Sequence, residues 1–555
     1  MMFFTAWAFL LVALVGADSD YHDPNFSGNH GVIVHLFEWK WIDIALECER
    51  FLGPKGFGGV QVSPPNENLM VPSRDRPWWE RYQPISYKLI TRSGNEAEFG
   101  DMCKRCNAAG VRIYVDAIIN HMTGTWVENI GTAGSLVTFA EWDFPGVPYT
   151  KSDFNQPICD IGTYHNATEV RNCQLQGLKD LNQRIPSVRT KIIDFMNHLL
   201  TLGVAGFRID AAKHMWPEDL KVIYDSLRDL VTDQGFEPGT RPFIFQEVID
   251  LGGEDVHREE YLGIGRVTEM RYGFNIGNLF RGNLELRKLI NWGGPYVEPG
   301  GEWFFMDHKD VIVFVDNHDT QRGGLGGAPI SYKMKRQYQA ANAFMLAHPF
   351  GLPKVMSSFD FNNNEEGPPS DSNFNTISPT INEDGSCGSG WVCEHRWPAI
   401  TQMVIFRNTV GGGEVTNWWD NENNQIAFCV GKRGFAAFNN EGRVLSENLD
   451  TGMPAGTYCD VITGIRVGSD CSGKKVVVDG SGRASIEVSN DDMAMAFHVG
   501  PESNLGASEV DTTSTSSTTT TTQNPGTDPE PGCGNGMEVK ATYEGATWSG
   551  CLYSN

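Results

Sequence analysis

The fold is decided by a stretch that reads Gly206-Phe207-Arg208-Ile209-Asp210. It is a short β-prone run that ends in an acidic residue. Four comparable runs, at residues 59–63, 111–116, 243–247 and 311–316, also end in a polar or acidic residue. Amphipathic helical stretches lie between such runs, for example at residues 187–202 and 217–232. Alternating β and α elements predict a parallel sheet, and this number of units favours a (β/α)8 TIM barrel over an open sheet. Polar residues at the carboxyl ends of barrel strands are typical of an active site.

Two regions depart from this alternation. Residues 120–182 are rich in Gly, Asp and Asn and contain a cysteine pair, which predicts an inserted loop-rich domain B between a strand and the next helix. Residues 413–500 show short alternating runs separated by turns, which predict a C-terminal antiparallel β-sandwich, domain C. The barrel, domain A, then comprises residues 18–119 and 183–412.

The far C-terminus differs in composition. Ser and Thr dominate residues 512–522, and Pro, Gly and acids follow, so we expect a solvated linker over residues 501–531. Residues 532–555 form a short tail with Cys533 and Cys551, and it is too small to fold without a bridge. The role of this tail stays open between the start of a larger module, a small binding appendage and a structural remnant.

The composition excludes two broad classes of protein. Hydrophobic residues make up 40% of the 555 residues and aromatic residues 11%, which excludes global disorder. The 44 Lys and Arg against 69 Asp and Glu give a formal net charge of −25. Such a chain repels a polyanion, so we expect no nucleic-acid partner.

The beginning of the chain indicates the compartment. Residues 1–17 are nearly all apolar, carry no Asp, Glu, Lys or Arg, and end in Gly16 and Ala17. This pattern predicts a secretory signal peptide with a mature chain from Asp18, and the alternative is an N-terminal core segment. The segment is short for a membrane span and no later apolar stretch reaches that length. We therefore expect a secreted, extracellular protein without a membrane partner.

The twelve cysteines agree with an oxidising compartment. Local spacing favours three disulfides, Cys159–Cys173, Cys387–Cys393 and Cys459–Cys471. The one C-x-x-C motif, at residues 103–106, lacks the second pair that a zinc site needs.

Three carboxylates are candidates for catalysis. Asp210, Glu247 and Asp319 each lie at or just past the end of a strand-like run, so all three can converge on one face of a barrel. Hydrolysis of an acetal needs one ionised carboxyl and one that holds a proton for the leaving oxygen. Three acids in one cleft help to keep one of them protonated. The alternative is that these acids cap helices or bind calcium.

Four motifs then point to a family. Residues 206–214, 245–248, 314–319 and 116–121 resemble the nucleophile, acid/base, third-carboxylate and first motifs of the α-amylase family, in that family's order and spacing. The flanking residues 35–39, 56–65 and 77–84 resemble the animal-type enzymes, and the resemblance covers residues 18 to about 500.

The resemblance implies a role for each matching residue. Asp210 would be the nucleophile, Glu247 the acid and then the base, and Asp319 would hold the hydroxyls of a distorted ring. Arg208 would help to keep Asp210 ionised, since the two side chains lie on one side of a strand. Substrate contacts would come from Trp78, Trp79, Tyr82, Gln83, His121, Tyr164, Lys213, His214, Glu254 and His318. From the residues alone, the aromatic side chains among them suit sugar stacking and core packing equally well.

The resemblance also implies two ions and one further disulfide. Calcium, which prefers oxygen ligands, would be held by the side chains of Asn120 and Asp180 and by the backbone carbonyls of Arg171 and His214. Chloride would be held by Arg208, Asn317 and Lys354, and it would favour the protonated form of Glu247. Lys354 stands where many relatives have arginine, so we expect weaker chloride binding. Cys48 would pair with Cys106, whereas Cys103 and Cys429 would pair with each other or stay free.

The resulting prediction is a monomeric, secreted, endo-acting α-amylase. It would hydrolyse internal α-1,4 bonds of starch and glycogen with retention of configuration through a covalent glycosyl-enzyme. A related α-glucosidase or transglycosylase shares the same machinery and differs in cleft shape. A catalytically dead glucan-binding protein is the alternative from another class, and such proteins usually lose an acid of the triad, whereas all three are present here.

Overall fold

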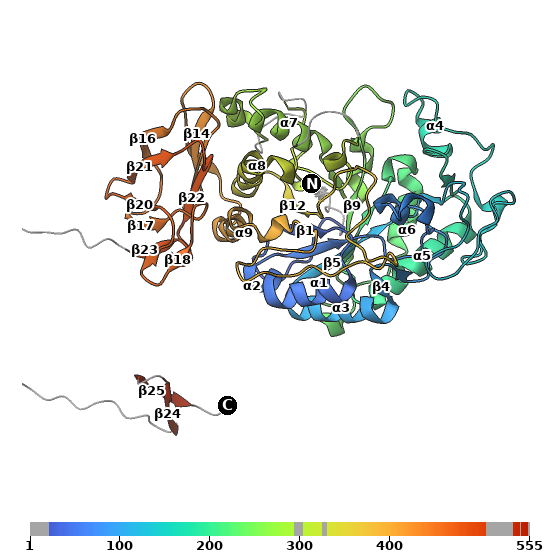
Figure 1. The fold of residues 1–555 in the computed structure, drawn as a ribbon, viewed down its shortest axis with the longest axis horizontal. Helices are drawn as coiled ribbons and strands as arrows, with labels where there is room; N and C mark the ends of the chain where they lie inside the picture. Colours follow the sequence, from blue (N-terminus) through green and yellow to red (C-terminus); the bar gives the residue numbers. More distant parts are fainter. Residues whose placement is uncertain (1–20, 294–302, 325–329, 507–536, 544–545, 553–555) are drawn as a thin grey trace, which may run out of the picture. The chain divides into compact units, whose positions relative to one another are not determined.

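The computed structural model describes residues 21–293, 303–324, 330–506, 537–543 and 546–552. Eight parallel strands close into a barrel in the order β1-β12-β11-β10-β9-β8-β5-β2 (Figure 1). The strands are β1 (Ile33–Leu36), β2 (Gly59–Val62), β5 (Arg112–Ala117), β8 (Gly206–Ile209), β9 (Phe243–Gln246), β10 (Arg266–Thr268), β11 (Val311–Val313) and β12 (Leu352–Ser357). The predicted TIM barrel is therefore confirmed.

Helices follow the strands and cover the outside of the barrel (Figure 1). They include α1 (Trp41–Glu47), α3 (Glu96–Ala108), α5 (Pro186–Thr201), α6 (Pro217–Asp225), α7 (Met270–Phe280), α8 (Arg336–Ala347) and α9 (Pro398–Val410). Local chemistry sets where they begin: Asn95 and Glu98 form a capping box at the start of α3, and proline opens α5, α6 and α9. The helix predicted over residues 217–232 ends early, at Asp225: the N–H groups of Ser226 and Leu227 donate three residues back, to Ile223 and Tyr224, and that of Arg228 donates to Asn197 Oδ1 (2.8 Å).

The segment between β5 and α5 is mostly irregular, as its composition predicts. It contains the short antiparallel pair β6 (His121–Met122) and β7 (Lys179–Asp180) and the short helix α4 (Ala167–Asn172). The disulfide Cys159–Cys173 closes the loop that carries α4.

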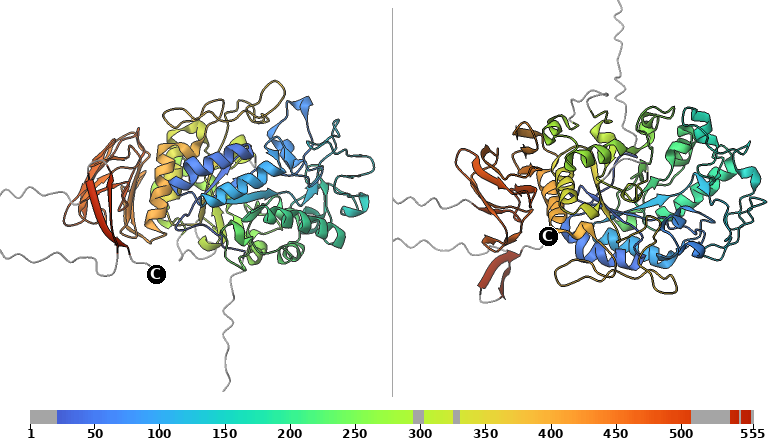
Figure 2. Two further views of the ribbon diagram at one scale, coloured as in Figure 1. Left: turned by 90° about the horizontal axis from the view of Figure 1, so that it is seen from below. Right: turned by 45° about the horizontal axis from the view of Figure 1, so that its top comes forward.

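Antiparallel sheets make up the C-terminal part of the first compact unit, residues 1–508. The largest is the sheet β13 (Val415–Asp420), β14 (Gln425–Val430), β15 (Gly434–Asn439) and β22 (Ala494–His498). Smaller sheets join β16 (Leu445–Asp450) to β21 (Arg483–Val488), and β17 (Gly456–Cys459) to β20 (Lys475–Val478) and β23 (Asn504–Gly506). In β21, exposed and buried residues alternate, as expected of a strand with one face on a core. Figure 2 shows these strands beside α9, and Phe344 of α8 packs against Phe428 and Phe438. The predicted C-terminal all-β domain is confirmed.

The four predicted disulfides, Cys48–Cys106, Cys159–Cys173, Cys387–Cys393 and Cys459–Cys471, are all present. Cys103 and Cys429 are buried free thiols, which decides between the two alternatives left open for them. In the second unit, residues 509–555, β24 (Met537–Tyr543) pairs with β25 (Ala546–Leu552). The predicted signal peptide, residues 507–531 of the linker and Cys533 lie outside the described residues.

Candidate active site

The carboxyl ends of the barrel strands bring the three candidate acids into one cleft. Asp210 directly follows β8, Glu247 directly follows β9, and Asp319 lies in the loop after β11. All three line a cleft of about 400 Å³. The remaining lining comes from Trp78, Trp79, Tyr82, His121, Tyr164, Leu175, Gln176, Leu178, Ala211, Lys213, His214, Ile249, Glu254, His318 and Gly324.

A single guanidinium, that of Arg208, contacts two of the three candidate acids and a further carboxylate, that of Asp116. Arg208 is 2% exposed, and its position in β8 lies opposite Asp116 in the neighbouring strand β5. Its Nη1 donates to Asp116 Oδ1 (2.5 Å) and to Asp210 Oδ1 (2.9 Å), while its Nη2 lies 2.7 Å from Glu247 Oε1. The other carboxylate oxygen of Glu247 accepts the N–H of Ala211 (3.0 Å). One cation therefore holds three carboxylates as close neighbours.

The excess of acids favours retention of a proton in the cluster. Burial raises the pKa of Asp210 well above its ordinary value, and Arg208 opposes this while Glu247 and Asp116 add to it. Burial, together with the charge of Glu247, raises the pKa of Asp319 to about 7. A site with one shared proton among several carboxyls contains both an acid and an ionised partner, which is what general acid catalysis requires.

Aromatic side chains near the acids are held in fixed orientations. Tyr82 stacks on His318 with ring centroids 5.2 Å apart and an interplanar angle of 5°, and its hydroxyl donates to Asp116 Oδ2 (3.0 Å). Trp78 packs edge-on against His318 (5.6 Å), and its Nε1 donates to the carbonyl of Asn364 (2.8 Å). Burial lowers the pKa of His121 to about 4, so its imidazole is neutral at neutral pH. Its Nε2 lies 3.2 Å from the carbonyl oxygen of Tyr82 and its Nδ1 lies 3.3 Å from Asn120 Nδ2, which fixes the ring in the cleft wall.

Another part of the cleft is built around a buried lysine. Lys213 Nζ donates to the carbonyl of Ile249 (2.6 Å) and forms an ion pair with Glu254. It also lies 4.8 Å from the ring centroid of Tyr164, and that ring meets His214 edge-on at 6.3 Å. This arrangement presents an aromatic face and a carboxylate to a bound ligand.

Gln83 is the predicted contact residue that does not line the cleft. Its side-chain oxygen accepts hydrogen bonds from Thr123 Oγ1 (2.7 Å), the N–H of Gly124 (2.9 Å) and Trp126 Nε1 (3.1 Å). In this structure Gln83 therefore anchors the loop that follows β6.

The oxygen atoms expected to bind calcium are buried and unpaired. Asn120 Oδ1 and Asp180 Oδ1 have no hydrogen-bond partner among the described residues, and the two residues lie together where β6 pairs with β7. Burial raises the pKa of Asp180 well above its ordinary value, which a nearby cation would reverse. His214 Nδ1 lies 2.9 Å from the carbonyl of Val170, so the segments that carry His214 and Arg171 adjoin. Two unpaired hard oxygens in a buried position fit calcium.

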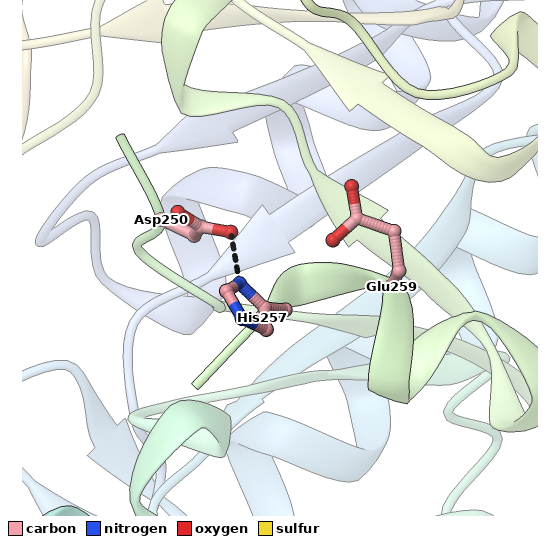
Figure 3. Close-up of side chains that lie close together, drawn as sticks. All are labelled: Asp250, His257 and Glu259. Carbon is pink, nitrogen blue, oxygen red and sulfur yellow. Dashed lines mark ion pairs between the residues drawn. The ribbon is translucent and has the colours of Figure 1, made fainter. Parts of the chain in front are cut away.

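A second group of potential metal ligands, Asp250, His257 and Glu259, lies outside this region (Figure 3). Asp250 already accepts the N–H groups of Gly252 (2.7 Å) and Arg258 (3.3 Å), and Arg271 lies 3.9 Å from it. Asp250 and Glu259 are therefore already engaged by backbone N–H groups and guanidinium groups of the protein.

Two of the three predicted chloride residues, Arg208 and Lys354, are buried cations that act on each other. Lys354 is 4% exposed, its Nζ donates to Gln61 Oε1 (2.7 Å), and the rings of Phe245 and Phe314 lie 5.6 and 5.3 Å from it. Burial and the charge of Arg208 lower the pKa of Lys354 to about 7. Asn317 Oδ1 accepts the N–H groups of Asp319 and Thr320, so its amide nitrogen is the group left for a ligand. Two neighbouring buried cations fit a monovalent anion, which would relieve their repulsion.

Two central residues were not among the predicted site residues. Asp116 joins Arg208 to Tyr82, and its position at the end of a strand-like run in the first motif was a usable signal. Arg322 donates to the carbonyl of His318 (3.2 Å) and lies 4.2 Å from the ring centroid of Phe361 and 5.5 Å from that of Trp78. No local pattern marks Arg322, because its aromatic partners come from distant segments.

Comparisons with known proteins agree with this geometry. Residues 62–239 match the family described as "Alpha amylase, catalytic domain", and residues 416–500 match "Alpha amylase, C-terminal all-beta domain". The chain is 56% identical to an α-amylase of Tribolium castaneum over 478 residues, which covers 86% of this chain and 95% of the relative. It is 53% identical to an α-amylase-related protein of Drosophila pseudoobscura pseudoobscura over 502 residues, covering 90% and 99% of the two chains.

A solved structure supports the same assignment. A mutant of α-amylase I from Eisenia fetida in complex with maltohexaose superposes with a TM-score of 0.80 and 41% identity, covering 85% of this chain and 98% of that one. The family matches, the sequence identity over most of both chains and the shared architecture agree with one another. The chain belongs to the α-amylase family of glycoside hydrolases and is of the animal type.

Proposed function

We propose that this α-amylase is secreted and cleaves internal α-1,4-glucosidic bonds of starch and glycogen with retention of anomeric configuration. The observation that carries the proposal is the contact of one guanidinium, that of Arg208, with both Asp210 and Glu247. Retaining glycosidases need two carboxyls about 5 Å apart, and contact with one guanidinium supports a short separation of Asp210 and Glu247.

In the first half of the reaction, Asp210 acts as the nucleophile. Its carboxylate oxygen forms a bond to the anomeric carbon, while the bond from that carbon to the glycosidic oxygen breaks. Glu247 transfers its proton to the departing oxygen, so the leaving chain departs as a neutral alcohol. Arg208 keeps Asp210 in position and stabilises the negative charge that it carries before attack.

In the second half, water takes the place of the departed chain. The ionised Glu247 accepts a proton from the water, whose oxygen bonds to the anomeric carbon as the ester bond to Asp210 breaks. Two inversions give net retention, and Glu247 regains the proton that it lost.

The other cleft residues position the sugar. Asp319, with His121 and His318, supplies hydrogen-bonding groups to the hydroxyls of the ring under attack. Trp78, Trp79, Tyr82 and Tyr164 offer flat apolar faces on which successive glucose units stack. Lys213, His214 and Glu254 complete the contacts, and Gln83 acts through the loop that it anchors.

Two ions would support this arrangement. Calcium would be held by Asn120 and Asp180, with backbone oxygens of Arg171 and His214, and it would tie the inserted segment to the barrel beside the cleft. Chloride would be held by Arg208, Asn317 and Lys354. Its negative charge would weaken the pull of Arg208 on the carboxylates and so favour a protonated Glu247.

The proposal includes the domain division predicted from sequence, with a barrel, an inserted domain B, a C-terminal domain and a linker before the tail. Four disulfides agree with export to an oxidising compartment. No helix in the described part of the chain is long and apolar enough to cross a bilayer.

The test is release of reducing ends from soluble starch by the full chain and by Glu247→Gln, which keeps the size of the side chain. We expect the variant to lose about three or more orders of magnitude in kcat while it still binds maltooligosaccharides. The anomer first released, followed by NMR, should be α. Release of the β-anomer would contradict retention, and an active Glu247→Gln would contradict the assigned acid.

A further inference from the structure

Trp126 lies in the loop after β6 and stacks on a residue of the cleft wall. Its ring centroid is 4.8 Å from that of Trp79, with an interplanar angle of 24°. Trp79 lines the cleft, whereas Trp126 is absent from the lining. Trp126 therefore covers one face of Trp79, while Trp79 remains part of the cleft lining.

Trp79 lies farther from the reacting groups than its neighbour Trp78. The ring of Trp78 contacts His318 and Tyr82 next to the acids, at 5.6 and 5.9 Å. The ring of Trp79 contacts Trp126, and its Nε1 donates to Glu365 Oε2 (2.5 Å). A glucose unit stacked on Trp79 would thus lie farther from the bond that is cleaved than one stacked on Trp78.

Trp126 is itself fixed by a second contact. Its Nε1 donates to Gln83 Oε1 (3.1 Å), the same atom that holds Thr123 and Gly124. The guanidinium of Arg74 lies 5.9 Å from the Trp126 ring centroid. Before any substrate binds, Trp79 is therefore held on one face by Trp126 and at its Nε1 by Glu365.

We propose that Trp126 is a positioning residue that favours long glucans by holding Trp79 in the orientation that stacks on a remote glucose unit. This inference rests on the proposed amylase function. Ordering a free tryptophan on binding costs conformational entropy, and a ring that is already stacked avoids most of that cost. Because the contact is remote from the reacting carbon, it stabilises the bound ground state and the transition state equally. Its loss therefore raises KM and leaves kcat unchanged.

The experiment compares Trp126→Ala with Trp126→Phe, which keeps a stacking ring but removes the hydrogen bond to Gln83. We expect Trp126→Ala to raise KM for maltoheptaose roughly 3- to 10-fold, with little change in kcat and no change in KM for maltotriose. Trp126→Phe should show less than half of that increase. An unchanged KM for maltoheptaose in Trp126→Ala overturns the inference, and so does an equal loss of kcat on both substrates, which indicates damage to the acids.

A double-mutant cycle separates positioning from direct contact. If Trp126 acts through Trp79, Trp126→Ala adds nothing to the effect of Trp79→Ala. A full additional loss in that background means that Trp126 touches the sugar itself, and it overturns the positioning role. Calorimetric binding of maltoheptaose to the same four proteins, each carrying Glu247→Gln, gives a readout that needs no turnover. If the wild-type chain proved inactive but bound maltoheptaose, the proposed function would be refuted. The binding affinities of the four proteins would still show whether Trp126 acts through Trp79.

Discussion

Replacement of Asp319 by asparagine is expected to stabilise the protein while it removes activity. Asp319 has a folded-state pKa of about 7, raised from 3.8 by burial and by the charge of Glu247. Between pH 4 and pH 7, the folded state keeps a proton that the unfolded state has released. The free energy of unfolding therefore falls as the pH rises through this window. Above pH 7 the folded state carries the whole free-energy cost of an ionised Asp319. Asparagine cannot ionise and escapes the penalty.

The structure bounds the size of this effect. Each pKa unit corresponds to about 1.4 kcal/mol, so the difference between 3.8 and about 7 gives at most about 4 kcal/mol. The Asp319 side chain keeps 29% of its exposure, and water screens part of the interaction. The proton is also shared with neighbouring acids, which further divides the effect. We expect a gain of about 1–2 kcal/mol at pH 8, or about 1–2 °C in Tm for a folded chain of this size.

The assay is thermal unfolding of the wild type and Asp319→Asn from pH 4 to pH 8, at one scan rate and one calcium concentration. The two Tm curves should coincide near pH 4 and separate steadily up to pH 8. Asp233→Asn, at an exposed carboxylate, serves as the control and should give no pH-dependent separation. A variant that is equally or less stable than the wild type at pH 8 would refute the reasoning, because the cluster would then not oppose the charge of Asp319.

The remaining predictions concern the ions and the inserted segment. In Lys354→Met, kcat measured with and without sodium chloride should be the same, because the proposed chloride site has lost one of its two cations. If chloride still raised kcat in this variant, the anion would bind elsewhere. Asp180→Asn should lower Tm and remove the sensitivity of Tm to EDTA, whereas the wild type should lose roughly 3 kcal/mol of stability on chelation if its site is saturated. Replacement of both Cys159 and Cys173 by serine should destabilise the closed loop by about 3 kcal/mol, since the bridge spans 14 positions, and limited proteolysis should then cut within residues 160–172.

The barrel could be predicted because its strands carry their own signal. The runs that precede Asp210 and Glu247 are buried along their whole length, so they appear in the sequence as short β-prone runs that hold a single polar residue, Arg208 or Gln246, among apolar ones. Strand β10 has three residues and begins with the half-buried Arg266, so it leaves no comparable pattern. Its existence follows from the need to close the barrel.

The site could be predicted only as a set of residue types. The strand-end rule indicates that Asp210 and Glu247 converge, but it does not show that Arg208 contacts both of them and Asp116 at once. That arrangement depends on the register between β5 and β8, which no local sequence feature encodes. The stacking of Trp79 on Trp126 joins two loops 47 positions apart, and it too depends on the folded chain.

Lys354, in the proposed chloride site, can be compared directly with an arginine at the same position. Lys354 presents a compact ammonium that donates to Gln61, and its folded-state pKa of about 7 means that a bound anion must also keep it charged. An arginine there would stay charged at any working pH and would offer a planar fork of donors. We therefore expect Lys354→Arg to reach half-maximal activation at a lower chloride concentration, with the largest difference above pH 7, where wild-type Lys354 loses its proton. The measurement is kcat against chloride concentration at pH 6 and pH 8. If the wild type and Lys354→Arg reached half-saturation at the same chloride concentration at both pH values, Lys354 would stay fully charged without the anion. The charges of Asp116 and Glu247 would then outweigh burial and Arg208 in setting the pKa of Lys354.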